Sequence, residues 1–194
     1  MAMRYICVYC GSNPGSRPEF AQAARALGET LARKGLGLVY GGGNVGLMGM
    51  LADAALKAGT EVIGVIPEDL VQREVAHSGL TTLHEVSSMH ERKSLMCGLA
   101  DGFIAMPGGF GTLDEIMEMV TWRQLGYHQK HCGLLNVAGY YDDFLRFLDG
   151  AVKSGLILKD HRSLVIAEQD ADRLIEQLLA EVTGAVKEKW GERV

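Results

Sequence analysis

Residues 102–115 read GFIAMPGGFGTLDE, and this stretch passes from a short apolar run through a glycine turn into the start of a helix. The run GFIAMP has the length and composition of a buried strand. Thr112 and Glu115 have the spacing of a capping box, which is typical of a helix start. We therefore predict a strand, a turn and a helix in that order.

The same order recurs along the chain. The predicted strands are nearly all apolar rather than alternating, as expected when helices cover both faces of a parallel sheet. We predict a single-domain α/β fold over residues 1–194, Rossmann-like and doubly wound, with a mainly parallel sheet of six or seven strands. An amphipathic helix and a charged tail are expected over about residues 169–194. The predicted strands are residues 4–10, 36–40, 61–67, 80–86, 102–107, 132–137 and 163–168.

Composition excludes several classes of protein. The formal net charge of −5 argues against a dedicated nucleic-acid binder, which needs a basic surface. No apolar run reaches the ~18 residues of a membrane span. The N-terminus, MAMRYICVYCGS, enters a predicted strand without the layout of a signal peptide. We expect a cytoplasmic protein without a nucleic-acid or membrane partner.

Cysteines and histidines do not predict a metal site. Cys7 and Cys10 form a C-x-x-C, but on a strand residues three apart face opposite sides of the sheet. All four cysteines are therefore expected to be reduced. The six histidines include no H-E-x-x-H, and His128 and His131 have no obvious third ligand.

Three glycine-rich turns follow predicted strands, at residues 9–16, 40–49 and 106–112. In open α/β sheets ligands bind at the carboxyl ends of the strands, and a helix N-terminus with free N–H groups binds phosphate. Residues 41–46 also fit G-x-G-x-x-G, so dinucleotide binding and a turn that merely packs helix on strand stay open. Three turns at one edge favour a mononucleotide phosphate site. The predicted N–H and hydroxyl donors are Ser12, Asn13, Gly42, Gly43, Gly109, Gly111 and Thr112.

Charged residues at two helix starts have two interpretations each. Ser88 and Glu91 form a capping box, but Arg92 and Lys93 lie where the helix dipole disfavours cations. They are either solvated or paired with Glu85 or Glu91, or Arg92 faces a ligand. Glu115 either serves its capping box or stabilises the oxocarbenium-like state of N-glycosidic cleavage, because a carboxylate beside a ribose can do so. Arginine cannot be the general acid, since its pKa exceeds about 12.

Several motifs together resemble one family. PGGFGTLDE fits P-G-G-x-G-T-x-x-E and MHERK fits M-H-x-R-K, while GSNPG, GGGNVGLMG, QLGYHQK and GLLNVAGYYD lie in the same order. Over roughly residues 4–160 the chain resembles the LOG ("Lonely guy") family, often mislabelled as lysine decarboxylases. The resemblance implies a homodimeric, cofactor-free phosphoribohydrolase with active sites near the subunit interface. Such an enzyme releases adenine or prenylated adenine and ribose 5-phosphate from AMP or cytokinin riboside 5′-monophosphates.

The resemblance also implies roles for individual residues. Arg92 and Glu115 would be the catalytic pair, with Met89 near the base. Molybdenum-cofactor carriers have a similar fold and similar glycine loops, so a non-catalytic nucleotide or cofactor carrier is the alternative; an NAD(P)-dependent oxidoreductase is a third. The expected substrate-binding residues, those from the glycine turns included, are Ser12, Gly42, Gly43, Glu74, Met89, Lys93, Gly108, Gly109, Phe110, Gly111, Thr112 and Thr121.

Overall fold

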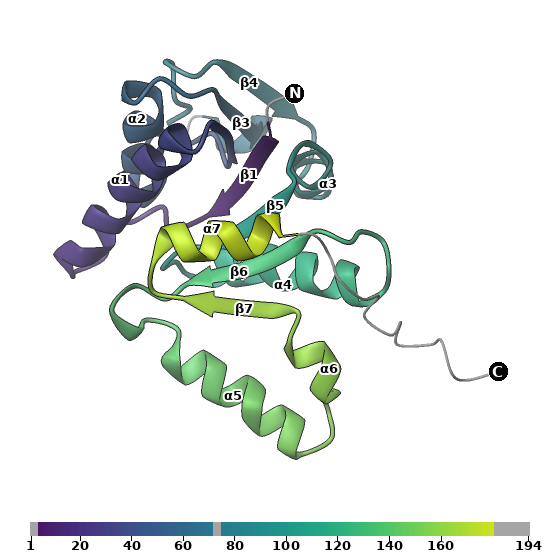
Figure 1. The fold of residues 1–194 in the computed structure, drawn as a ribbon. Helices are drawn as coiled ribbons and strands as arrows, with labels where there is room; N and C mark the ends of the chain where they lie inside the picture. Colours follow the sequence, from purple (N-terminus) through teal and green to yellow (C-terminus); the bar gives the residue numbers. More distant parts are fainter. Residues whose placement is uncertain (1–3, 72–74, 181–194) are drawn as a thin grey trace.

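A sheet of seven parallel strands forms the centre of the described structure, a computed structural model that covers residues 4–71 and 75–180 (Figure 1). The strand order is β4-β3-β2-β1-β5-β6-β7, and every neighbouring pair is parallel. The predicted Rossmann-like sheet is therefore confirmed. The strands are β1 (Arg4–Tyr9), β2 (Leu36–Tyr40), β3 (Val62–Pro67), β4 (Thr82–Val86), β5 (Gly102–Ala105), β6 (His131–Leu135) and β7 (Val165–Glu168).

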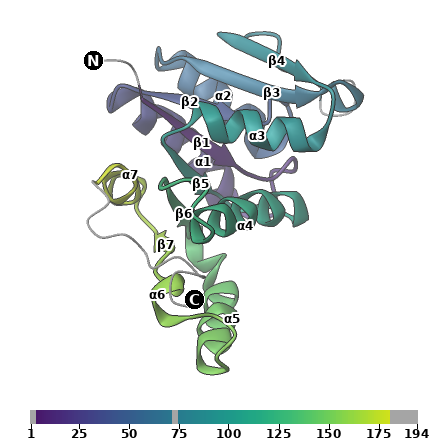
Figure 2. The same cartoon turned by 90° about the vertical axis from the view of Figure 1, so that its right-hand side faces the viewer.

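Helices cover both faces of this sheet. Alternate residues of β1 enter two different cores: Ile6 and Val8 pack with α1, α2 and α7, whereas Cys7 and Tyr9 pack with α3 and α4. Figure 2 shows α3 and α4 on the same side of the strands. The helices are α1 (Pro18–Arg33), α2 (Gly46–Lys57), α3 (Met89–Leu99), α4 (Phe110–Gln124), α5 (Asp142–Lys153), α6 (Lys159–Arg162) and α7 (Ala171–Leu179), with 3₁₀ turns η1 (Glu68–Leu70) and η2 (Val137–Gly139).

The first two cysteines lie in different cores, as their strand spacing predicts. Cys7 belongs to the core under α3 and α4, whereas Cys10 belongs to the core under α1 and α2. All four cysteines are free and buried. The C-x-x-C is therefore neither a disulfide nor a pair of facing thiols.

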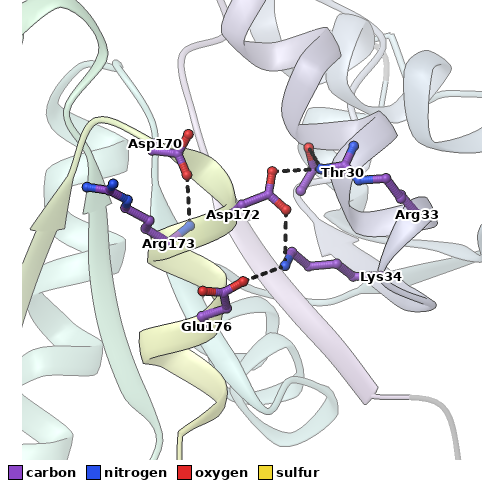
Figure 3. A network of polar contacts seen from close by, with 7 residues as sticks. All are labelled: Thr30, Arg33, Lys34, Asp170, Asp172, Arg173 and Glu176. Atoms are coloured by element: carbon purple, nitrogen blue, oxygen red, sulfur yellow. Dashed lines mark hydrogen bonds and ion pairs between the residues drawn. The ribbon is translucent and has the colours of Figure 1, made fainter.

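An ion-pair network joins the first helix to the last described one (Figure 3). Asp172 on α7 accepts from Arg33 at 2.7 Å and from Lys34 at 3.0 Å, and Glu176 contacts Lys34 at 3.2 Å. The two carboxylates and Arg33 are solvent-exposed and Lys34 is partly exposed, so each pair contributes about 1 kcal/mol at most. The network therefore links the end of α1 to α7 at the surface of the molecule.

One predicted helix start is correct and the other is wrong. Ser88 caps α3, because its Oγ accepts from Glu91 N at 3.2 Å, as the capping box predicts. Helix α4 begins at Phe110, with Gly109 at the N-cap position and no side-chain cap, so the predicted capping box of Thr112 and Glu115 does not form. The helix begins earlier than predicted, which places Thr112 inside its first turn.

The sequence predicts a terminal amphipathic helix with a charged tail, and no membrane span. The predicted terminal helix corresponds to α7, and the charged tail from residue 181 onward lies outside the described residues. Across residues 4–71 and 75–180, no helix is long and apolar enough to cross a membrane.

Candidate active site

The three glycine turns meet where the strand order reverses, between β1 and β5. Backbone hydrogen bonds join them: Gly11 N donates to Pro107 O at 3.1 Å, and Leu47 N donates to Gly11 O at 3.0 Å. Such a reversal leaves a crevice at the carboxyl ends of the strands. The structure thus brings the turns after β1, β2 and β5 to one place.

The first backbone N–H groups of α4 are not capped by the side chain of the N-cap residue. The first N–H groups of a helix have no intrahelical partner, and Gly109 supplies no capping group. A Cβ atom added to Gly109 or Gly111 would meet nothing within 4 Å, whereas one on Gly108 would overlap Thr112 Oγ1. Gly108 is therefore required by packing, and Gly109 and Gly111 leave open space beside the free N–H groups.

Arg92 is almost fully buried, with 5% of its surface exposed. Its Nη2 donates to the Gly41 carbonyl at 2.9 Å, and its Nη1 lies 3.7 Å from Met89 Sδ. A Cβ atom on Gly41 would overlap Arg92 Nη2, so glycine at this position is what admits the guanidinium. The interpretation of Arg92 as a solvated helix residue is therefore wrong.

Glu115 and Arg92 both influence the pKa of Cys7, a buried residue of β1. Burial raises the pKa of the Cys7 thiol well above its ordinary value; Glu115 raises it further and Arg92 lowers it. Glu115 also contributes to the raised pKa values of Tyr9 and Cys10, which are mainly caused by burial. A carboxylate on α4 and a guanidinium on α3 are thus both close enough to Cys7 on β1 to shift the pKa of its thiol.

Comparison with known proteins identifies the family of the chain. The family model described as possible lysine decarboxylase matches residues 48–178. The cytokinin riboside 5′-monophosphate phosphoribohydrolase LOG of Oryza sativa subsp. japonica is 50% identical over 175 residues, which are 90% of this chain and 72% of that protein. LOG7 of Arabidopsis thaliana, with the same enzyme name, is 46% identical over 173 residues, covering 89% and 80%.

This chain belongs to the LOG family. Among solved structures, the molybdenum cofactor binding protein from Rippkaea orientalis matches the LOG-family chain with a TM-score of 0.70 and 25% identity, covering 94% of this chain and 99% of that one. The fold is therefore shared with a protein whose name describes binding rather than hydrolysis.

Lys93 of the LOG-family chain has acidic partners on the neighbouring helix. Its Nζ lies 3.1 Å from Asp114 Oδ2 and 3.0 Å from Glu118 Oε2. Burial lowers the pKa of Lys93, but its ion pairs with Glu118 and Asp114 outweigh this effect, so the pKa is above its ordinary value. The structure therefore places this ammonium between α3 and α4, and its acid partners are neither Glu85 nor Glu91.

Of four further predicted substrate contacts, two lie beside the glycine turns, one lies elsewhere, and one is outside the described residues. Met89 adjoins Arg92, and Phe110 at the start of α4 is 95% exposed. Thr121 lies about 16 Å further along α4 at 1.5 Å per residue. It lines a separate small hollow with Leu148. Glu74 lies outside the described residues.

The turn after β2 is shaped by the segment that follows β3. His77 N donates to Gly42 O at 2.9 Å, and Gly43 forms an antiparallel bridge with Ala76. The backbones of Gly42 and Gly43 are thus held from one side by this segment. Ser12, on the turn after β1, is exposed beside the start of α4.

Sequence reasoning assigned no role to two tyrosines in the motif GLLNVAGYYD. Tyr140 lines a cavity of about 220 Å³ together with Ser12, Gly108 and Gly109. Its hydroxyl donates to the Gly108 carbonyl, and the Tyr141 hydroxyl donates to the Met106 carbonyl at 2.6 Å. The adjacent pair of tyrosines in a glycine-containing turn is the signal that could have indicated these contacts.

Proposed function

We propose that this LOG-family chain hydrolyses the N-glycosidic bond of cytokinin riboside 5′-monophosphates and of AMP. The products are the free base, adenine or its prenylated form, and ribose 5-phosphate. The observation that carries this proposal is that Arg92 and Glu115 both lie near Cys7 on β1, with Glu115 in the second turn after the uncapped start of α4. The relatives that share about half of its residues carry the name of this enzyme.

The start of α4 fits the 5′-phosphate. Free N–H groups and the positive end of the helix dipole favour an anion, and the open glycines let it approach the backbone. Six residues separate Gly109 from Glu115, about 9 Å along a helix axis. Because helical side chains lean toward the N-terminus, Glu115 would reach back to the sugar of a nucleotide whose phosphate sits at the helix start.

The chemistry follows from this placement. The bond between the anomeric carbon and the base nitrogen breaks, and its electron pair leaves with the base, which gains a proton. Glu115 stabilises the positive charge that develops on the sugar and orients the attacking water. The water oxygen bonds to the anomeric carbon and releases a proton. Arg92, held by the Gly41 carbonyl, positions the sugar.

The competing function is a non-catalytic nucleotide or cofactor carrier. The likeness to the molybdenum cofactor binding protein supports a shared fold at 25% identity, whereas the named phosphoribohydrolases are nearly twice as similar in sequence. A carrier also needs no carboxylate beside the sugar. We therefore favour the hydrolase.

The test is direct. Purified protein is incubated with AMP, with isopentenyladenosine 5′-monophosphate and with adenosine, and free base and ribose 5-phosphate are measured by chromatography. We expect release from the two monophosphates and little from adenosine, which lacks the phosphate. Binding of AMP without any release of adenine from either monophosphate would contradict the hydrolase and favour a carrier.

We also propose that the enzyme is a homodimer. Large apolar side chains are exposed on and after α5, namely Phe147, Leu156 and Leu158. Exposed apolar side chains that adjoin one another are typical of an interaction surface. Sedimentation at micromolar concentration should show a dimer, and Phe147→Glu should shift it toward monomer; a monomeric wild type would contradict this proposal.

A cytoplasmic location is the remaining part of the proposal. The four cysteines are free and buried, and burial raises the pKa of the Cys132 thiol to about 12. Free structural thiols are typical of a reducing compartment.

A further inference from the structure

Three consecutive carbonyls before α4 are each held by a donor from elsewhere in the fold. The Met106 carbonyl accepts from the Tyr141 hydroxyl at 2.6 Å, and the Gly108 carbonyl accepts from the Tyr140 hydroxyl. The Pro107 carbonyl between them accepts from Gly11 N at 3.1 Å. The oxygen atoms of this loop are thus directed toward protein donors, which leaves the N–H side at the start of α4 for a ligand.

The turn that carries both tyrosines is strained. Ala138 has φ 51° and ψ 34°, a left-handed conformation that is uncommon for a residue with a Cβ atom, and Gly139 follows with φ 76°. Such strain persists only where surrounding contacts hold it, and it is concentrated at functional sites.

Side chains around the turn hold it in this conformation. Asn136 donates to Asp142 Oδ1 at 2.7 Å and accepts from Tyr141 N at 2.7 Å. Arg17 donates to the Ala138 carbonyl at 3.2 Å. The result is that two adjacent residues, Tyr140 and Tyr141, both send their hydroxyls to one loop.

Tyr140 is the member of the pair that reaches the site. It is 42% exposed, its ring packs edge-on against Phe20 at 5.5 Å between centroids, and it lines the cavity of about 220 Å³ beside Ser12 and Gly109. Tyr141 is buried, with 2% exposed. Tyr140 therefore touches both the loop and the space in which a ligand would lie.

We propose that Tyr140 is a positioning residue for phosphate recognition: by holding the Gly108 carbonyl, it keeps the loop with its N–H groups toward the phosphate of the substrate. This rests on the proposed function, which puts the 5′-phosphate at the start of α4. Without the hydroxyl, the Gly108 carbonyl is free to turn toward the anion and repel it. The proposed effect is specific for phosphorylated ligands, because the proposal puts only the phosphate at this loop.

The experiment measures binding by calorimetry for the wild type, Tyr140→Phe and the control Tyr127→Phe, which removes a hydroxyl from a 74% exposed tyrosine lining a different pocket. The ligands are inorganic phosphate, ribose 5-phosphate, AMP and adenosine. We expect Tyr140→Phe to weaken binding of the three phosphorylated ligands about threefold to tenfold, the value of one hydrogen bond. Adenosine affinity and the Tyr127→Phe variant should be unchanged.

Two results would overturn the role of Tyr140. One is phosphate and AMP affinities within twofold of the wild type. The other is an equal loss for adenosine, which would show general damage to the pocket; the melting temperature of each variant checks the fold separately. This experiment measures binding, so its failure can be told apart from a failure of the proposed function. In the latter case the wild type binds AMP but releases no adenine.

Discussion

Arg92 and Gly41 make a contact that only glycine permits. Nη2 of Arg92 donates to the Gly41 carbonyl at 2.9 Å, and a Cβ atom on Gly41 would overlap that same nitrogen. The contact joins the end of β2 to the first turns of α3, two elements separated by about fifty residues. It fixes the guanidinium in a buried position beside the proposed sugar site.

Gly41→Ala should therefore displace Arg92 while leaving most of the fold intact. We expect kcat/KM for AMP to fall about 100-fold, because a misplacement of about 1 Å can cost that much. The control is Gly98→Ala on the same helix as Arg92, where an added Cβ meets nothing within 4 Å. That variant should keep its activity and gain up to about 1 kcal/mol of stability. Equal activity of both variants would show that the placement of Arg92 is unimportant.

Glu115→Gln tests the carboxylate itself. The amide keeps the shape of the side chain but removes the charge that would stabilise the developing oxocarbenium ion. We expect kcat to fall about 10²- to 10⁴-fold with little change in melting temperature. Glu176→Gln, on the exposed face of α7, is the matched control and should retain wild-type turnover. Near-normal turnover of Glu115→Gln would leave this residue without a catalytic role.

Lys93→Met tests the link between α3 and α4. The Lys93 side chain is 10% exposed and contacts both Asp114 and Glu118, so its removal leaves two carboxylates close together without a cation. We expect the free energy of unfolding in urea to fall by about 2 to 3 kcal/mol, below the ~3–5 kcal/mol of fully buried pairs because Asp114 is largely exposed. Lys34→Met, which also removes a lysine with two acidic partners but at the surface, should cost less than about 1 kcal/mol. Similar losses in both variants would contradict a special role of Lys93.

His128 should make the protein less stable in mild acid. Burial, followed by the nearby Lys130, lowers the pKa of His128 from 6.5 to about 4 in the folded protein. Between these values the unfolded chain binds a proton that the folded protein does not, so the free energy of unfolding falls as the pH drops from about 7 to 4. The loss is at most about 3 kcal/mol.

The measurement compares urea unfolding of the wild type and His128→Asn at pH 7 and pH 5. Asparagine retains an acceptor for the Lys130 N–H, which donates to His128 Nδ1 at 3.1 Å. The variant should lose less stability than the wild type on acidification. Parallel pH profiles would exclude His128 as a source of the acid sensitivity.

The sequence predicted the architecture because burial on both faces of a parallel sheet dictates composition directly. Seven short apolar runs correspond to the seven strands, with ends that differ by one or two residues. The opposite orientation of Cys7 and Cys10 follows from the two-residue repeat of a strand. The cap at Ser88 was predictable for the same reason, since it depends on residues only three positions apart.

Local sequence patterns gave one wrong helix start and did not indicate contacts between residues that are distant in the sequence. The spacing from Thr112 to Glu115 fits a capping box, yet the helix begins at Phe110 with Gly109 as the N-cap residue, so Thr112 already lies inside the helix. The partners of Lys93 are 21 and 25 positions away and belong to another helix, so no nearby acid indicated them. Tyr140 contacts Gly108 from 32 positions away.

The sequence by itself determined the fold class, the family and the glycine turns that meet at the site, because these depend on composition and on spacing within a few residues. Only the tertiary structure decided that Arg92 rests on Gly41, that Lys93 joins two helices and that Tyr140 holds the loop before α4. The physical reason is that each of these contacts closes a long loop of chain, and its geometry exists only once the sheet has brought the ends of its strands together.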